Sequence, residues 1–115
     1  MEYKYNVYSD IYHLILTGKK NIEVRLLNEK SEKILVGDYI TFNNLGKEGE
    51  QIRVRVLNKN IYDNVSLLIE DNDIEKILPH CSAKELELLL IKIFGDMVNI
   101  ESVRECCLSL PLVTE

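Results

Sequence analysis

The ten residues 17–26 constrain the fold more than any other part of this sequence, because a helix must end and a strand must begin within them. Ahead of them, Ser9 and Asp10 are residue types that favour a helix N-terminus, and apolar residues follow at helical spacing. Gly18 stands where the residue after a helix takes up a left-handed conformation, which glycine adopts most easily. These signals predict a short helix over about residues 10–17.

Apolar and polar side chains alternate immediately after the glycine, which predicts a strand buried on one face. Residues two apart on a strand share a face, with Cα atoms roughly 7 Å apart. Glu23 and Arg25 are therefore expected to point outward together, with Lys20 at the start of the strand. A carboxylate flanked by two cations is held ionised. The apolar positions of this strand are Ile22, Val24 and Leu26.

The spacing of these charges allows two interpretations. The cluster suits a polar ligand that carries both hydrogen-bond donors and acceptors. Alternatively, it is an ordinary exposed strand face, with an ion pair that adds less than about 1 kcal/mol to stability. From spacing alone the second interpretation is favoured.

A resemblance to a known family favours the ligand site. The pattern Gly18-x-Lys20-x-x-Glu23-x-Arg25 resembles the G-x-K-x-x-E-x-R signature of the ASCH domain family, whose fold is PUA-like. The pair Gly37-Asp38 also resembles the turn that leads into the next barrel strand of that family. The resemblance implies a cleft between the first helix and the barrel, lined by the charged residues of the signature.

The elements predicted along the rest of the chain fit the same family up to about Gly95, which is expected to end the last long helix. A capping box, S-x-x-E, marks the start of that helix. Residues 28–33 are polar and are expected to form a loop, and residues 103–110 suggest a final strand that ends at Pro111. The other predicted strands are 3–8, 39–43 and 51–57, and the other predicted helices are 66–70, 73–78 and 83–94.

Length and composition fit one domain. The chain has 115 residues, of which 46% are apolar, so it can build a proper core. No apolar run approaches the roughly 20 residues that span a bilayer, and the first residues have no apolar signal core. We therefore expect a cytoplasmic α+β domain over residues 1–115 that makes no membrane contact. The expected fold is a PUA-like small mixed β-barrel with a short N-terminal helix and a longer C-terminal helix.

The cysteines indicate neither a disulfide framework nor a metal site. Cys81, Cys106 and Cys107 are an odd number, and two of them are adjacent, so reduced thiols are expected. His80 beside Cys81 lacks the spacing of a metal-binding motif. No metal and no cofactor are therefore predicted.

The charge of the chain is uneven. The formal net charge is −5, yet residues 1–60 carry ten Lys and Arg against eight Asp and Glu. An acidic protein is a poor non-specific binder of duplex nucleic acid, because cation–phosphate contacts dominate that affinity. A nucleotide, a nucleoside or a short RNA, bound locally by the N-terminal half, is the better expectation.

The first functional hypothesis is therefore a binding module for RNA or for a nucleotide or nucleoside. Glu23 is expected to accept from an exocyclic amine of a base, and Arg25 to hold a phosphate or carbonyl oxygen. Lys20 supplies a point charge. The expected ligand-binding residues are Gly18, Lys19, Lys20, Glu23 and Arg25.

The second hypothesis is a hydrolase, and the sequence does not decide between enzyme and binding module. The resemblance extends to amidohydrolases that deacetylate N4-acetylcytidine and to ribonucleases. The amidohydrolases have threonine where this chain has Glu23, and a glutamate that aligns near Pro79, with Glu75 the nearest here. A variant mechanism would use Glu23 as general base and Lys20 to stabilise an oxyanion. A ribonuclease would use Lys20 and Arg25 on the phosphate.

The third hypothesis is an interaction domain. The predicted helix 83–94 has a wide apolar stripe that could bind a protein partner or a second copy of the chain. Under the two ligand hypotheses, alanine at Lys20 or Glu23 is expected to leave the fold intact and to abolish binding or turnover.

Overall fold

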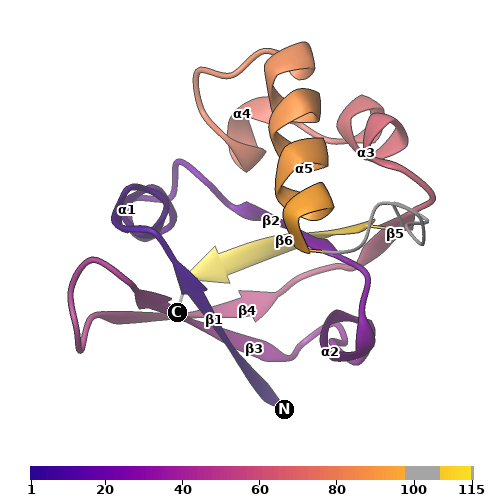
Figure 1. The fold of residues 1–115 in the computed structure, drawn as a ribbon. Helices are drawn as coiled ribbons and strands as arrows, with labels where there is room; N and C mark the ends of the chain where they lie inside the picture. The colour runs from indigo at the N-terminus through magenta and orange to yellow at the C-terminus, as the bar shows by residue number, and fades with distance from the viewer. Residues whose placement is uncertain (98–106, 115) are drawn as a thin grey trace.

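The computed structural model describes residues 1–97 and 107–114, and within them it has six strands and five helices (Figure 1). The strands are β1 (Glu2–Val7), β2 (Ile22–Leu26), β3 (Tyr39–Asn44), β4 (Gln51–Val56), β5 (Asn60–Tyr62) and β6 (Cys107–Thr114). The helices are α1 (Ser9–Leu16), α2 (Glu29–Glu32), α3 (Val65–Asp71), α4 (Ile74–Ile77) and α5 (Ala83–Met97).

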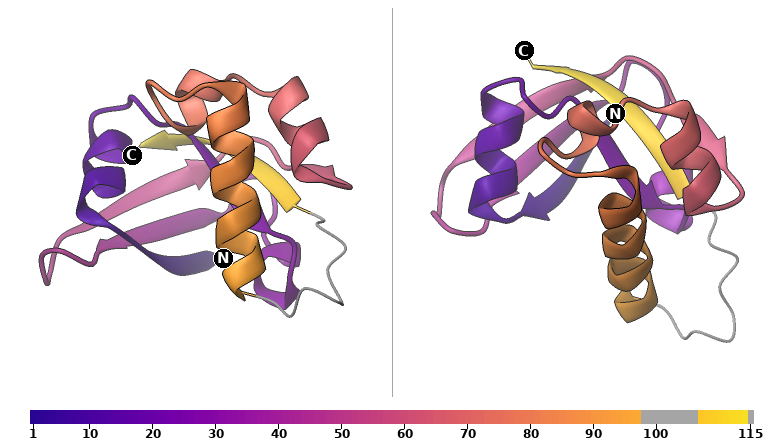
Figure 2. Two further views of the ribbon diagram at one scale, coloured as in Figure 1. Left: turned by 45° about the horizontal axis from the view of Figure 1, so that its top comes forward. Right: turned by 90° about the horizontal axis from the view of Figure 1, so that it is seen from above.

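The strands form one mixed sheet in the order β1-β3-β4-β6-β2, with β5 added beside β6. β1 and β3 are parallel, and the other pairs are antiparallel. The sheet curls into an open barrel whose two edge strands in this order are β1 and β2 (Figure 1). The predicted α+β fold with a small mixed barrel is thereby confirmed. In Figure 2, α5 stands away from the curled sheet beside α3 and α4.

Two hydrophobic cores flank β2 and β6. The barrel core joins α1 to β1, β3, β4 and β6, and the helical core joins β2 to α3, α4 and α5. The barrel core contains Val7, Tyr12, Ile15, Ile34, Ile40, Phe42, Ile52, Val54, Val56, Leu110 and Leu112. The helical core contains Val24, Leu26, Val65, Leu68, Ile69, Ile77, Leu86, Leu90 and Phe94.

Around α1 and α2 the structure agrees with the local sequence signals except at two points. Tyr8 occupies the N-cap of α1 without a side-chain cap, so the helix begins one residue before the predicted start. Gly18 has a φ of +75°, as the prediction of a left-handed helix end requires. The loop predicted over 28–33 is wrong for residues 29–32, which form one helical turn. Asn28 and Ser31 exchange hydrogen bonds of 2.9 Å there, a capping box that a search for apolar periodicity does not detect.

Two predictions for the C-terminal part need correction. Gly95 does not end α5, which continues to Met97, because a helix tolerates an interior glycine at a cost of about 1 kcal/mol. Of the predicted strand 103–110, residues 103–106 lie outside the described residues. Pro111 lies inside β6 rather than at its end. There β6 passes from pairing with β5 and β2 to pairing with β4, so the missing N–H costs little.

Candidate ligand-binding cleft

The segment between α1 and β2 is held by backbone hydrogen bonds at both of its ends. The N–H of Lys20 donates to the carbonyl of Leu14 on α1 at 3.0 Å. The N–H of Asn21 donates to the carbonyl of Lys76 on α4, also at 3.0 Å. The left-handed Gly18 allows the chain to turn back for these contacts. Lys20 is thereby placed at the start of β2, beside the end of α4.

The ammonium group of Lys20 is surrounded by acceptors. Its Nζ donates to the carbonyl of Ile22 at 2.6 Å and to that of Ile77 at 2.8 Å, and it lies 3.5 Å from Oε1 of Glu23. An ammonium has three N–H donors, and the two backbone carbonyls take two of them, while the third contact is an ion pair. Burial lowers the pKa of Lys20, and the carboxylate of Glu23 opposes that effect. The three acceptors fit the protonated form.

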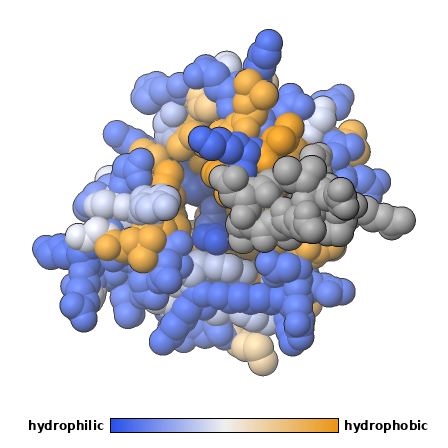
Figure 3. Space-filling model, viewed as in Figure 1, coloured by the Kyte–Doolittle hydropathy of each residue, from blue (hydrophilic) through white to orange (hydrophobic). Residues whose placement is uncertain are grey.

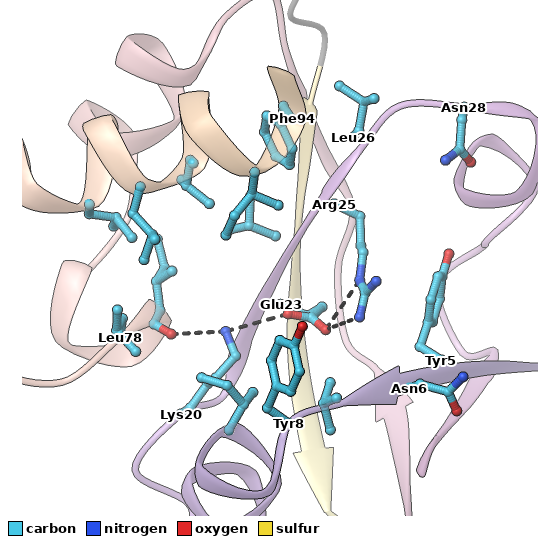
Figure 4. A pocket seen from close by; sticks show the side chains of 18 residues that line it. Tyr5, Asn6, Tyr8, Lys20, Glu23, Arg25, Leu26, Asn28, Leu78 and Phe94 are labelled. Atoms are coloured by element: carbon cyan, nitrogen blue, oxygen red, sulfur yellow. Dashed lines mark hydrogen bonds and ion pairs between the residues drawn. The ribbon is translucent and has the colours of Figure 1, made fainter. Parts of the chain in front are cut away.

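Glu23 lies between the two cations. Its Oε2 accepts from Nε of Arg25 at 3.3 Å and from Nη2 at 3.0 Å, while Oε1 has the longer contact with Lys20 (Figure 4). Burial alone would raise the pKa of Glu23. The charges and hydrogen bonds of Lys20 and Arg25 outweigh that effect and hold the pKa below its ordinary value. Glu23 is therefore an ionised carboxylate.

Burial separates this cluster from an ordinary exposed strand face. Lys20 is 6% exposed and Glu23 5%, whereas the side chain of Arg25 keeps 26% of its surface exposed. Glu23 and Arg25 share a face of β2, as the alternation predicts, but they do not project into open solvent. The expectation that alanine at Lys20 or Glu23 leaves the fold intact assumes exposed side chains, and their burial removes that assumption.

A cleft of about 260 Å³ lies along this charged face. Its walls come from the end of β1 and the start of α1, from β2 and the residues that flank it, from the end of α4, and from the apolar side of α5. Figure 3 shows a hollow on this face with hydrophilic residues at its bottom. The cleft lies beside the start of α1, as the prediction has it, but α5, which the prediction does not include, supplies the opposite wall. The wall residues used below are Tyr5, Tyr8, Asn28, Leu89 and Ile93.

The other predicted site residues lie apart from this cleft. Gly18 and Lys19 are exposed and are not among its lining residues, so their role in binding stays a prediction. Glu75, the nearest glutamate to the position that the amidohydrolases use, accepts a hydrogen bond from the backbone N–H of His80 at 3.2 Å and does not line the cleft.

The sequence analysis missed the aromatic and amide residues of the cleft. The strand pattern places Tyr5 and Tyr8 in a first strand and favours packing over base stacking as their role, and it places Asn28 in a loop. The one available signal was the run of tyrosines directly before α1, in a half of the chain that also carries the cations. Nothing in that run shows which tyrosine faces the charged strand, since the curl of the sheet decides it.

The described residues offer neither a metal site nor a membrane span. Within 1–97 and 107–114, no three His, Cys, Asp or Glu side chains come together in a way that could hold a metal ion. The helices of these ranges are too short or too polar to cross a bilayer. Cys81, the cysteine whose side chain is described, is a free thiol, and burial raises its pKa.

Comparison with known proteins gives structural relatives only. No protein-family model matches the sequence, and no curated protein matches it either. The crystal structure of the hypothetical protein PH0355 superposes with a TM-score of 0.80 at 26% identity, covering 100% of both chains. The solution structure of protein PF0455 from Pyrococcus furiosus superposes with a TM-score of 0.72 at 27% identity, covering 99% of this chain and 97% of the other.

An ASCH domain is among the similar structures. The crystal structure of the ASCH domain from Lactobacillus crispatus JV V101 superposes with a TM-score of 0.58 at 16% identity, covering 98% of this chain and 79% of that one. At this identity the likeness concerns the fold alone. It agrees with the signature in residues 18–25, which lies between a helix and a barrel strand in the structure as expected. The chain therefore has the fold of an ASCH domain, and the resemblance drawn from its sequence is confirmed at the level of the fold.

Proposed function

We propose that the cleft binds the base of a nucleoside, a nucleotide or a short single-stranded RNA, and that Glu23 recognises the exocyclic amine of that base. The observation that carries this proposal is a buried, ionised carboxylate on the floor of an open cleft. Oε2 of Glu23 is occupied by Arg25, but Oε1 has only a 3.5 Å contact with Lys20. Oε1 therefore keeps capacity for a ligand N–H, as carboxylates accept from cytosine or adenine amines.

The walls of the cleft suit a flat ring. Tyr8, which is 73% exposed, forms part of one wall of the cleft. Leu89 and Ile93, which are partly exposed, form part of the opposite wall on α5. An aromatic or apolar side chain can stack on any base, since every base has a π-face. The cleft volume of about 260 Å³ is just below the roughly 300–1,000 Å³ typical of drug-sized ligands, which favours a single base or nucleoside.

The same contacts favour binding over hydrolysis. An oxyanion-stabilising lysine needs a free N–H at the reacting oxygen, but two backbone carbonyls accept from Lys20, and Glu23 lies 3.5 Å from its Nζ. A general base works best with a pKa near the working pH, whereas Lys20 and Arg25 lower the pKa of Glu23. Lys20 thus acts as a support that fixes Glu23 against α4.

Titration calorimetry with four nucleosides tests this proposal. Cytidine and adenosine carry an exocyclic amine, whereas uridine and inosine do not, so we expect the first two to bind at least about tenfold more tightly, since a hydrogen bond to a charged group contributes about 1.5–3 kcal/mol. Glu23→Gln should remove most of this preference. Glu29→Gln, at a glutamate whose side chain is 92% exposed, is the matched control and should change nothing.

Two results would overturn the proposal. One is the absence of binding for all four nucleosides and for a short single-stranded RNA. The other is a preference for cytidine and adenosine that survives in a folded Glu23→Gln variant, because Glu23 would then not read the amine. Thermal unfolding of each variant shows whether it is folded. Product formation during the same incubations, followed by chromatography, would instead support the hydrolase.

A further inference from the structure

Positive charge gathers around Tyr5 at one end of the cleft, where Asn28 also borders a neighbouring hollow that Lys30 lines. The Cζ atom of Arg25 lies 4.1 Å from the centre of the Tyr5 ring, and Nζ of Lys30 lies 3.8 Å from the same centre. Glu23 already faces both Lys20 and Arg25, and Lys30 forms no ion pair among the described residues. Desolvation lowers the pKa of Lys30, and the positive charge of Arg25 lowers it further.

The same end presents hydrogen-bond donors without acceptors. The hydroxyl of Tyr5 is buried and has no partner among the described residues. Such a group is rare in folded proteins and calls for an explanation. Of the five N–H donors of Arg25, two are used among the described residues, both by Oε2 of Glu23. Asn28 turns its amide nitrogen toward the cleft, because its oxygen accepts from the N–H of Ser31 (Figure 4).

We infer that this end, formed by Tyr5, Arg25 and Lys30, is a subsite for a phosphate group. A phosphate offers several acceptor oxygens and negative charge, which match the unused donors and the excess cations, and a guanidinium fits it in a planar, two-bonded geometry. This inference rests on the proposed function, with the base at Glu23. The two ends adjoin, because the guanidinium of Arg25 contacts both Glu23 and the ring of Tyr5.

The subsite narrows the ligand class. An uncharged nucleoside would leave the cations unbalanced and the Tyr5 hydroxyl without a partner. A nucleoside monophosphate or a phosphodiester of single-stranded RNA would both balance the cations and accept a hydrogen bond from the Tyr5 hydroxyl. Lys30 keeps further N–H donors for this purpose, since its described hydrogen bond is to the carbonyl of Lys4.

Titration calorimetry can separate the subsite from the base site. The probes are cytidine, adenosine, their 5′-monophosphates and the dinucleotide CpC. We expect the phosphate to tighten binding by at least about tenfold over the nucleoside, as charge-assisted hydrogen bonds do. Lys30→Gln and Tyr5→Phe should each reduce that gain at least threefold, and Lys30→Gln, at a residue that does not line the cleft, should leave nucleoside affinity unchanged. Lys33→Gln, one helical turn along and exposed, is the matched control and should preserve the gain.

Each outcome decides between the two proposals. Nucleoside binding without a gain from phosphate would overturn the subsite and leave the base site standing. A gain that persists in both Lys30→Gln and Tyr5→Phe would place the phosphate elsewhere and also overturn it. Failure of every probe to bind would overturn both proposals. A gain for the monophosphates alone would identify a free nucleotide, whereas an equal gain for CpC would identify an RNA backbone.

Discussion

The barrel core and the helical core come from different sequence patterns and meet at one strand. In the barrel, alternating strands such as β4 bury every second residue, whereas α5 buries Leu86, Leu90 and Phe94 at helical spacing. Both cores are apolar. Among the described residues, the buried charged side chains are Lys20 and Glu23, which lie beside β2 where the two cores meet.

β2 belongs to both regions in different ways. Its backbone pairs with β6, whose Leu110 and Leu112 pack in the barrel core, while its own Val24 and Leu26 pack against the helices. Its charged residues therefore lie between two packed regions rather than in either. A buried ion pair is weak support for stability compared with apolar residues of the same size. Under the proposed function, this strand keeps its charges for binding, while the cores on each side supply the stability.

The largest effect is expected from Glu23→Ala, which removes the shared partner of Lys20 and Arg25. A buried cation left without its partner costs about 3–5 kcal/mol, so the free energy of unfolding should fall by about that amount. Urea unfolding at neutral pH measures the loss. Glu29→Ala, at an exposed ion pair with Lys33, should cost less than about 1 kcal/mol. Equal small losses for both variants would show that the charges between the cores are no different from surface charges.

A core substitution should have the next largest effect and should test whether the two cores unfold together. Leu86→Ala removes a side chain that is 1% exposed and should lower the free energy of unfolding by about 2–4 kcal/mol. Leu88→Ala on the same helix, 60% exposed, should stay within about 0.5 kcal/mol. Because β2 and β6 link the cores, hydrogen exchange should accelerate in β3 and β4 as well. Acceleration confined to α3 and α5 would mean that the cores open separately.

Acid should weaken the contact between the cores before it affects either core. The pKa of Glu23 is lower in the folded protein than its ordinary value, so the unfolded chain binds its proton first as the pH falls. The stability from this group is present above about pH 4.3, the ordinary glutamate value, and is lost as the pH falls through the folded pKa. Stability measured against pH should decline less over that window in Glu23→Gln. If stability declined equally steeply with falling pH in the wild type and in Glu23→Gln, the assignment of this pH dependence to Glu23 would be contradicted.

The sequence was sufficient for the fold because the relevant signals are local. Gly18 marks the end of α1, the capping box at residues 82–85 marks the start of α5, and strand alternation in β4 separates buried from exposed positions. These signals depend on backbone hydrogen bonds and on which side of one element is apolar. The error at Pro111 arose where strand pairing overrode a residue preference, and the error at Gly95 arose because a helix tolerates an interior glycine.

The cleft was only half predictable, because half of it comes from distant segments. Strand spacing brought Glu23 and Arg25 to one face, but their burial follows from the approach of α4 and α5. Tyr5 reaches Arg25 only because the open barrel brings the edge strands β1 and β2 to the same cleft. No local pattern in the sequence predicts that Tyr5 and Arg25 lie next to each other.

The smallest effect, and one of opposite sign, is expected from Tyr5→Phe. This substitution keeps the ring between the cations and removes only a buried hydroxyl that has no partner among the described residues. Removing an unsatisfied polar group is neutral or stabilising, so the free energy of unfolding should stay the same or rise by up to about 1 kcal/mol. Thermal and urea unfolding of the ligand-free protein measure it. A clear loss of stability would mean that the hydroxyl already serves the fold, and the case for reserving it for a phosphate would fail.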